Sequence, residues 1–218
     1  PFGPTHLSAH SKEVLGWIDY VELGEVWNHE VFLDPVQSSG LALRVPIGES
    51  GNDFLIAEFR TQTGFDHQIP AEGVLMYKQD LTASRRPDPA TNDPYFLTVL
   101  EQDNNNGLLR NSYEGGNRGE AGGAWGVSSP AGKQSASSGP LLKLSTGPVR
   151  AVTVHDVAIL DGRARLVIST SWAPILRKFL ETQGPSLSQA ESSYLDELGN
   201  GNGRYDLGDL RAWLRDNG

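Results

Sequence analysis

The chain has 218 residues, and 38% of them are hydrophobic, which is enough for a globular fold with a substantial core. The net charge of −9 argues against a general nucleic-acid binder, because phosphate contact requires a basic surface. The absence of cysteine excludes disulfides, thiol nucleophiles and cysteine-ligated metal centres. The sequence begins Pro1-Phe2-Gly3-Pro4 with no signal-peptide pattern, so we expect that its original N-terminus is missing. No apolar run reaches the roughly 18 residues of a membrane span.

The first half of the chain predicts one short helix and then a series of strands. Residues 8–18 have helical spacing, which Gly16 weakens. Residues 41–47 alternate between apolar and other side chains, as in a half-buried strand, and Pro46 indicates an edge position. Denser apolar runs predict further strands, the first two of them central, at residues 54–59, 74–77 and 95–100.

The second half begins with a long loop and returns to strands. Residues 102–138 are dominated by Gly, Asn and Ser, as in a functional or mobile loop. Strands are predicted at residues 141–144, 149–160 and 164–170, and Asp161-Gly162 predicts a hairpin turn between the last two. We therefore expect a mainly β fold, with a β-sandwich-like body of antiparallel sheets, a short N-terminal helix and a small C-terminal helix–loop–helix.

The tail predicts a separate helical segment. Ser188 and Glu191 form a capping-box pattern at the start of one helix, and residues 207–214 predict a second short helix. We expect the β-rich body over residues 1–172, a linker over 173–185 and the helix–loop–helix over 186–218.

The loop between these two helices has the spacing of a cation site. Calcium takes six to eight oxygen ligands, which a 12-residue loop supplies at positions 1, 3, 5, 7, 9 and 12, with Gly at position 6. When Gly203 is placed at position 6, five of the six ligand positions hold oxygen donors: Asn200, Asn202, the Arg204 carbonyl, Asp206 and Asp209. The pattern resembles one repeat of a dockerin module.

The first ligand position of this loop holds Leu198, which cannot bind a cation. With only two carboxylates, the sequence predicts a weak calcium site at most. The alternative is a helix–turn–helix in which the Asn and Gly residues only satisfy turn geometry and Asp206 caps the second helix.

No catalytic motif is present in the sequence. His29-Glu30 begins like HExxH, the zinc motif with two histidines on one helical face, but Leu33 stands where the second histidine is required. His6 and His10 are four residues apart without a glutamate next to either, so we favour ordinary histidines over a zinc pair. We expect Glu58 and Arg60 to form a structural ion pair on one face of a strand, and Met76 to lie in the core.

Two stretches resemble secreted zinc metalloproteases of the immune-inhibitor-A-like family. Residues 6–17 match the pattern hL-x-A-x-x-K-x-x-L-G-W. Residues 54–75 match fLi-x-E-x-R, GfD and lP-x-x-Gll in order and spacing. The resemblance covers residues 4–125 and continues more faintly to residue 172. It departs from the family at Gly119–Gly123, where Gly stands in place of a common Asp, so we do not expect calcium in that loop.

The resemblance implies that this chain is the C-terminal part of an exported endopeptidase that cleaves protein substrates. It implies that zinc is held only in an upstream catalytic part, so this chain carries no catalytic residue and is inactive alone. The alternative is a non-enzymatic extracellular β-sandwich that binds carbohydrate or protein. For that alternative, Trp27, Trp125 and Trp172 are candidates for a sugar-stacking platform, although core aromatics are the more ordinary interpretation.

Overall fold

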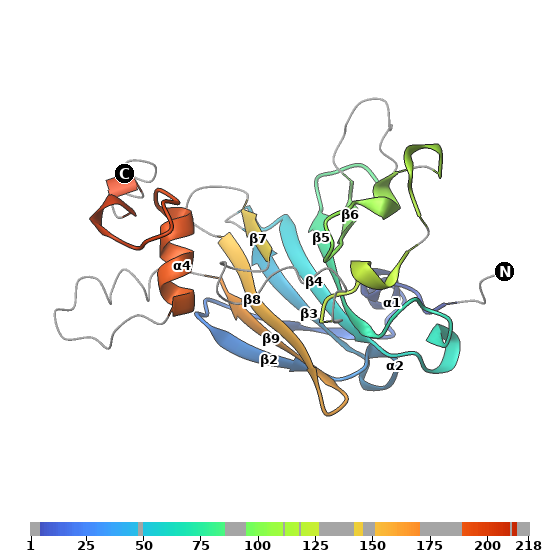
Figure 1. Ribbon diagram of the computed structural model, residues 1–218. Helices are drawn as coiled ribbons and strands as arrows, with labels where there is room; N and C mark the ends of the chain where they lie inside the picture. Colours follow the sequence, from blue (N-terminus) through green and yellow to red (C-terminus); the bar gives the residue numbers. More distant parts are fainter. Residues whose placement is uncertain are drawn as a thin grey trace.

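The computed structural model describes residues 5–47, 50–85, 95–110, 112–117, 119–126, 142–145, 151–170, 189–209 and 211–212. The predicted fold class is confirmed, because the described residues form two β-sheets with short helices around them (Figure 1). The predicted linker over 173–185 and the capping residue Ser188 lie outside the described residues.

The first sheet has five strands in the order β1-β3-β4-β5-β6. Their bounds are Asp19–Glu22, Leu41–Ile47, Asp53–Arg60, Gly73–Asp80 and Leu97–Leu100. Strands β3 to β6 pair antiparallel, whereas β1 pairs with β3 in parallel. The short helix α2, Val36–Ser39, lies in the connection between β2 and β3. The sequence pattern predicted neither α2 nor the parallel pair.

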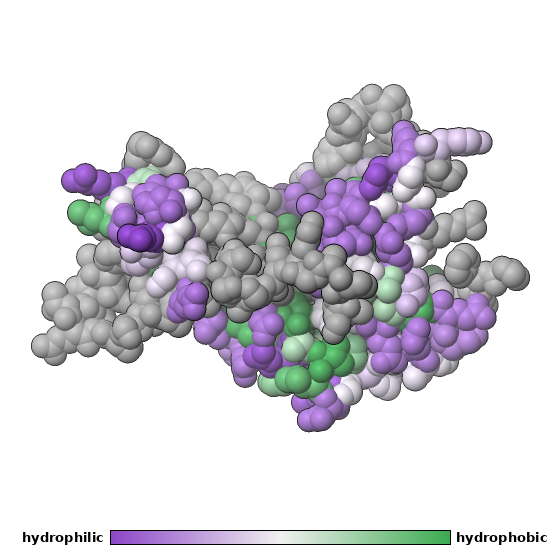
Figure 2. Space-filling view, in the orientation of Figure 1, coloured by the Kyte–Doolittle hydropathy of each residue, from purple (hydrophilic) through white to green (hydrophobic). Residues whose placement is uncertain are grey.

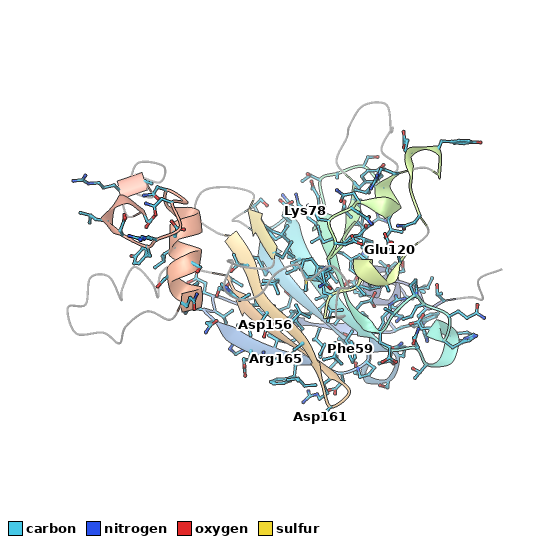
Figure 3. All side chains as sticks on the ribbon, viewed as in Figure 1. Phe59, Lys78, Glu120, Asp156, Asp161 and Arg165 are labelled. Carbon is cyan, nitrogen blue, oxygen red and sulfur yellow. The ribbon has the colours of Figure 1, made fainter. Side chains whose placement is uncertain are left out.

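The second sheet has four antiparallel strands in the order β2-β9-β8-β7. Their bounds are His29–Leu33, Arg163–Ser169, Ala151–Leu160 and Leu142–Ser145. Asp161 and Gly162 join β8 to β9, and both have positive φ angles, 50° and 76°, as a tight hairpin turn requires. Asp161 lies at the tip of this hairpin in Figure 3.

The main core lies between the two sheets. Leu43, Leu55 and Phe59 of the first sheet share one buried cluster with Leu166 and Ile168 of the second. The opposite face of the first sheet has a second cluster, in which Ala9 and Val36 of the helices pack on Ile56 and Tyr77. The first sheet is therefore covered on both faces, which explains the nearly continuous apolar runs of β4 and β5.

Strand β3 is interior in the sheet, but Pro46 itself occupies an edge position, as predicted. β3 pairs with β4 along Leu43–Ile47, including Pro46 with Phe54. On its other side, β3 pairs with β1 only from Leu41 to Arg44. Pro46 thus lies beyond the end of β1, where its missing N–H costs no ladder bond on that side.

Helix α1, Ala9–Val14, is shorter than predicted. The Ser8 hydroxyl caps its start by accepting a bond from the Ser11 amide at 3.3 Å. Gly16 has a φ of 69° and ends the helical conformation soon after Val14. At the other end of the chain, helix α4 spans Gln189–Leu198.

The predicted loop after β6 contains three 3₁₀ turns: η2 at Gly107–Leu109, η3 at Ser112–Glu114 and η4 at Ala121–Gly123.

The surface over this loop and over the tail is largely hydrophilic in Figure 2, whereas hydrophobic residues show over the β8–β9 hairpin. Phe32 and Leu160, in strands of the second sheet, are both largely exposed. None of the described helices is both long and apolar enough to cross a membrane.

Candidate functional site

The predicted cation loop follows helix α4, and local hydrogen bonds fix its conformation. The Asn200 side-chain oxygen accepts from the Asn202 amide at 3.0 Å, and the Asn202 oxygen accepts from the Arg204 amide at 2.9 Å. Asp206 accepts from the Gly208 amide at 2.6 Å. Such bonds are those of Asx turns, so the loop geometry by itself fits both the calcium interpretation and the turn-only alternative.

The last predicted ligand, Asp209, is the most deeply buried of the five, with 2% of its surface exposed. Its two carboxylate oxygens accept from the Asn200 amide at 2.9 Å and from the Asp206 amide at 2.6 Å. Burial, together with the charge of Asp209, raises the pKa of Tyr205 to about 12. The Asp209 carboxylate therefore lies inside the loop and ties its two ends together.

Asp196, in the last turn of α4, also faces this loop, which the sequence analysis did not predict. One carboxylate oxygen, Oδ2, accepts from the Gly203 amide at 2.9 Å, across the middle of the loop. The other oxygen, Oδ1, is buried and has no hydrogen-bond partner among the described residues. Asp196 lies two residues before Leu198, the position at which the loop template requires its first ligand. The only signal in the sequence for this contact was that Asp196 is an acidic residue close to the start of the loop.

Two glycines allow the loop to pack this tightly. A Cβ atom at Gly199 would lie 2.3 Å from the Cβ of Asp209. A Cβ atom at Gly208 would lie 2.5 Å from the Asn200 side-chain nitrogen and 2.8 Å from an Asp206 carboxylate oxygen. The side chains of Asn200 and Asp206 therefore both pack against Gly208.

A second polar arrangement lies inside the β-rich body, between α1 and the first sheet. We call it the buried polar cluster, and its members are Lys12, Glu58, Arg60, Asp66 and Tyr77. The predicted ion pair is confirmed, since Arg60 Nη2 lies 3.0 Å from Glu58 Oε1. The Tyr77 hydroxyl donates to the same Glu58 oxygen at 2.6 Å, and Arg60 Nη1 lies 3.6 Å from Asp66.

Burial shifts the pKa of two groups in this cluster. Desolvation raises the pKa of Tyr77 well above its usual value, an effect reinforced by the charge of Glu58. Burial lowers the pKa of Lys12, while the Glu58 carboxylate opposes that shift. Tyr77 is therefore a hydroxyl donor to Glu58 and not a phenolate. Glu58 is therefore paired with Arg60 and with the Tyr77 hydroxyl. The Lys12 ammonium is buried without a hydrogen-bond partner among the described residues and interacts with Glu58 through its charge.

The buried polar cluster also holds the N-terminal segment against the sheet. The Arg60 guanidinium donates to the carbonyls of His6 and Leu7 at 3.1 and 2.6 Å. Asp66 accepts from the His6 amide at 2.8 Å. These bonds join residues more than 50 positions apart in sequence, so they fix the path of the chain as it enters α1.

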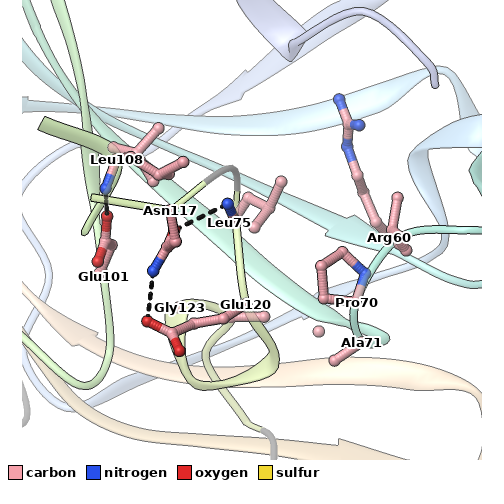
Figure 4. Close-up of a pocket in the computed structure, with 14 residues that line it drawn as sticks. Arg60, Pro70, Ala71, Leu75, Glu101, Leu108, Asn117, Glu120 and Gly123 are labelled. Atoms are coloured by element: carbon pink, nitrogen blue, oxygen red, sulfur yellow. Dashed lines mark hydrogen bonds between the residues drawn. The ribbon is translucent and has the colours of Figure 1, made fainter. Parts of the chain in front are cut away.

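An apolar pocket of about 170 Å³ lies beside Arg60, between β5, β6 and the loop after β6. Its walls are mainly apolar, from Ile69, Pro70, Ala71, Leu75, Val99, Leu108 and Ala124. Glu101, Asn117 and Glu120 border it (Figure 4). Glu101 accepts from the amides of Gly107 and Leu108, and Asn117 donates to Glu120 at 2.6 Å. These polar groups are therefore engaged in holding the loop.

His29 and Glu30 lie in strand β2. The rings of His6 and His10 contact different aromatic residues, Phe65 and Phe96. Met76 is fully buried in the main core, as expected.

Of the tryptophans that were candidates for a sugar-stacking platform, the two that the structure describes do not form one together. Trp125 is buried in the main core, and its indole N–H donates to the Leu100 carbonyl at 2.6 Å. Trp27 packs edge-on against the His155 ring. Trp172 lies outside the described residues.

Comparison of the chain with protein-family models, with curated proteins and with solved structures found no match. Within the described part of the chain, no three His, Asp or Glu side chains are already close enough together to hold a metal ion. The two polar arrangements and the sequence patterns are therefore the features that bear on function.

Proposed function

We propose that this chain is the C-terminal portion of a secreted zinc metalloendopeptidase whose zinc-binding helix lies upstream in the same polypeptide. In this proposal the chain contributes no catalytic residue, binds no zinc itself and is inactive alone. Its partners are the upstream catalytic part and, through that part, protein substrates outside the cell.

One observation carries the proposal: the polar residues of the matching motifs meet in one place. Lys12 comes from the first motif, Glu58 and Arg60 from the second, and Asp66 from the GfD element. All four are buried in the polar cluster. Buried charges are costly unless opposite charges lie close to them. The burial of these four residues in one cluster therefore gives a structural reason for their presence in the motifs. That reason supports the resemblance as more than a chance match of apolar residues.

The cluster also suggests what this portion does for the enzyme. Arg60 and Asp66 bind the backbone of His6 and Leu7, which lie directly before α1. In a longer polypeptide, such an anchor would fix the direction in which the preceding catalytic part joins the β-sandwich. The β-rich body would then pack against the catalytic part and hold it in a fixed orientation.

The coding sequence upstream of Pro1 tests this proposal. We expect it to encode HExxH within roughly 100 residues, because the two histidines and the glutamate of the zinc site must come from that segment. An open reading frame that continues upstream without such a motif would overturn the proposal.

The apolar pocket favours a second candidate, a non-enzymatic extracellular binding module. A concave apolar surface bordered by a few polar groups is the usual form of a small-ligand site. The pocket has this form, with Asn117 and Glu120 at its border. This candidate predicts no upstream HExxH, so the same coding sequence discriminates between the two.

A further inference from the structure

We infer that Asp196 supplies the carboxylate that the tail loop lacks at its first position, so that the loop and the end of α4 form one calcium site. The ligands would be the side chains of Asp196, Asn200, Asn202, Asp206 and Asp209 and the backbone carbonyl of Arg204. This inference does not depend on the proposed function, because it rests only on residues 196–209.

The position of Asp196 is the first argument. In a calcium loop of this type, the first and last ligands come from the two flanking helices and face each other across the loop. Asp196 lies in the last turn of α4, and Asp209 in the helical turn at 207–209. Asp196 reaches the middle of the loop at Gly203, and Asp209 reaches its start at Asn200. The two carboxylates thus approach the loop from opposite ends.

The unsatisfied oxygen of Asp196 is the second argument, and it is independent of loop geometry. Only 9% of the Asp196 surface is exposed, and its Oδ1 atom is buried without a hydrogen bond to any described residue. A buried carboxylate oxygen without a partner is costly, and buried charges in proteins are paired or coordinate metals. Gly203 holds the other oxygen, which keeps the carboxylate directed at the loop.

The remaining donors have free capacity for a cation. A side-chain amide oxygen has two lone pairs, and a carboxylate has about four acceptor positions. Asn200 and Asn202 each use their oxygen on one amide of the loop, and Asp209 uses one bond at each oxygen. Because the acidic side chains are not yet gathered at coordination distance, the site requires a small closure in which they move toward the ion.

The oxygen set selects calcium over magnesium. Six oxygen donors, three of them carboxylates, suit the large and adaptable coordination shell of calcium. Magnesium requires a tight octahedron and usually retains several waters. The third carboxylate also removes the reason for predicting a very weak site from Asp206 and Asp209 alone.

The test is calorimetric titration of the full chain with calcium chloride, together with amide NMR spectra that follow Gly203. For the wild type we expect saturable heat at or below about 1 mM calcium, the range of extracellular modules. We also expect the Gly203 amide resonance to shift with calcium and not with equal magnesium. Asp196→Asn keeps an acceptor for the Gly203 amide but removes the charge, and it should weaken calcium binding at least 10-fold.

Asp161→Asn is the matched control, because Asp161 is an exposed aspartate in the β8–β9 turn, outside the loop. Its calcium affinity should equal that of the wild type. Three results would overturn the inference: no heat and no Gly203 shift with calcium, wild-type affinity in Asp196→Asn, or an equal loss in Asp161→Asn, which would indicate a general charge effect.

Discussion

At the scale of single residues, Arg60 joins the first sheet to the N-terminal segment. It binds Glu58, lies near Asp66 and donates to two backbone carbonyls of the N-terminal segment. Arg60→Met leaves two fully buried carboxylates without their cation, and we expect a loss of about 3–5 kcal/mol in the free energy of unfolding. Urea denaturation of both proteins measures this difference.

The control for this prediction is an arginine in an exposed ion pair. Arg163 lies 2.8 Å from Asp34, and both side chains are about half exposed. Arg163→Met should therefore change the free energy of unfolding by about 1 kcal/mol or less. Equal losses in the two variants would contradict the central role given to the buried polar cluster.

His155 makes stability depend on pH. Burial lowers the pKa of His155 to about 4, and its ring nitrogen Nε2 lies 3.0 Å from the Thr153 hydroxyl and 2.9 Å from the Ser169 hydroxyl. The folded state thus favours the neutral ring, whereas the unfolded chain binds a proton near pH 6.5. The contribution of the neutral His155 ring to the free energy of unfolding is complete above about pH 6.5. It is lost as the pH falls toward 4, and the loss reaches up to about 3 kcal/mol.

Chemical denaturation at a series of pH values, compared with His155→Gln, measures this contribution. The variant lacks the titrating group, so the difference in unfolding free energy between the two proteins should change between pH 6.5 and 4. His67→Gln, at an exposed histidine, should retain the wild-type profile. A constant difference between wild type and His155→Gln across this range would show that His155 does not titrate as described.

At the scale of elements, the β8–β9 hairpin depends on the backbone of its turn. Gly162 has a φ of 76°, and a Cβ atom there would meet nothing within 4 Å. Gly162→Ala therefore adds strain without a clash, and we expect it to cost about 1–2 kcal/mol. Gly24 is the matched control, because its surroundings are equally open and its φ is not positive. Thermal unfolding should show a loss in Gly162→Ala and almost none in Gly24→Ala.

Much of the element order was predictable because the patterns are local. Alternation identified β3, dense apolar runs identified β4 and β5, and the Asp161-Gly162 pair identified the hairpin. The parallel pair of β1 with β3 was not predictable, because it depends on a connection through β2, which joins the other sheet. Pro46 correctly indicated an edge position, because β1 pairs with β3 only as far as Arg44.

The candidate site was predictable only in part. The loop ligands follow a fixed spacing, which the sequence shows directly. Asp196 does not follow that spacing, and only the hydrogen bond to Gly203 across the loop reveals that it faces the other donors. The buried polar cluster could be anticipated as one ion pair, Glu58 with Arg60. Its link to Asp66 and to the N-terminal segment arises from tertiary packing.

At the scale of the whole molecule, the described chain is a β-sandwich with helices on one sheet and a helical tail after it (Figure 1). Of the charged residues labelled in Figure 3, Lys78, Asp156 and Arg165 belong to strands of the two sheets, whereas Phe59 is part of the core between the sheets. Lys78 lies 3.6 Å from Asp53, and Arg165 binds Glu30 and Asp156 across neighbouring strands. These pairs are structural, so the surface charges of the sheets contribute to stability and not to chemistry in our proposal.

Casein hydrolysis tests the central claim most directly, with the full-length polypeptide and the 218-residue chain assayed side by side in zinc, with and without a chelator. Our account predicts that the full-length protein cleaves casein, that the chelator abolishes the cleavage, and that the 218-residue chain is inactive under the same conditions. Chelator-sensitive cleavage by the 218-residue chain itself, or a folded full-length protein without any proteolytic activity, would contradict it.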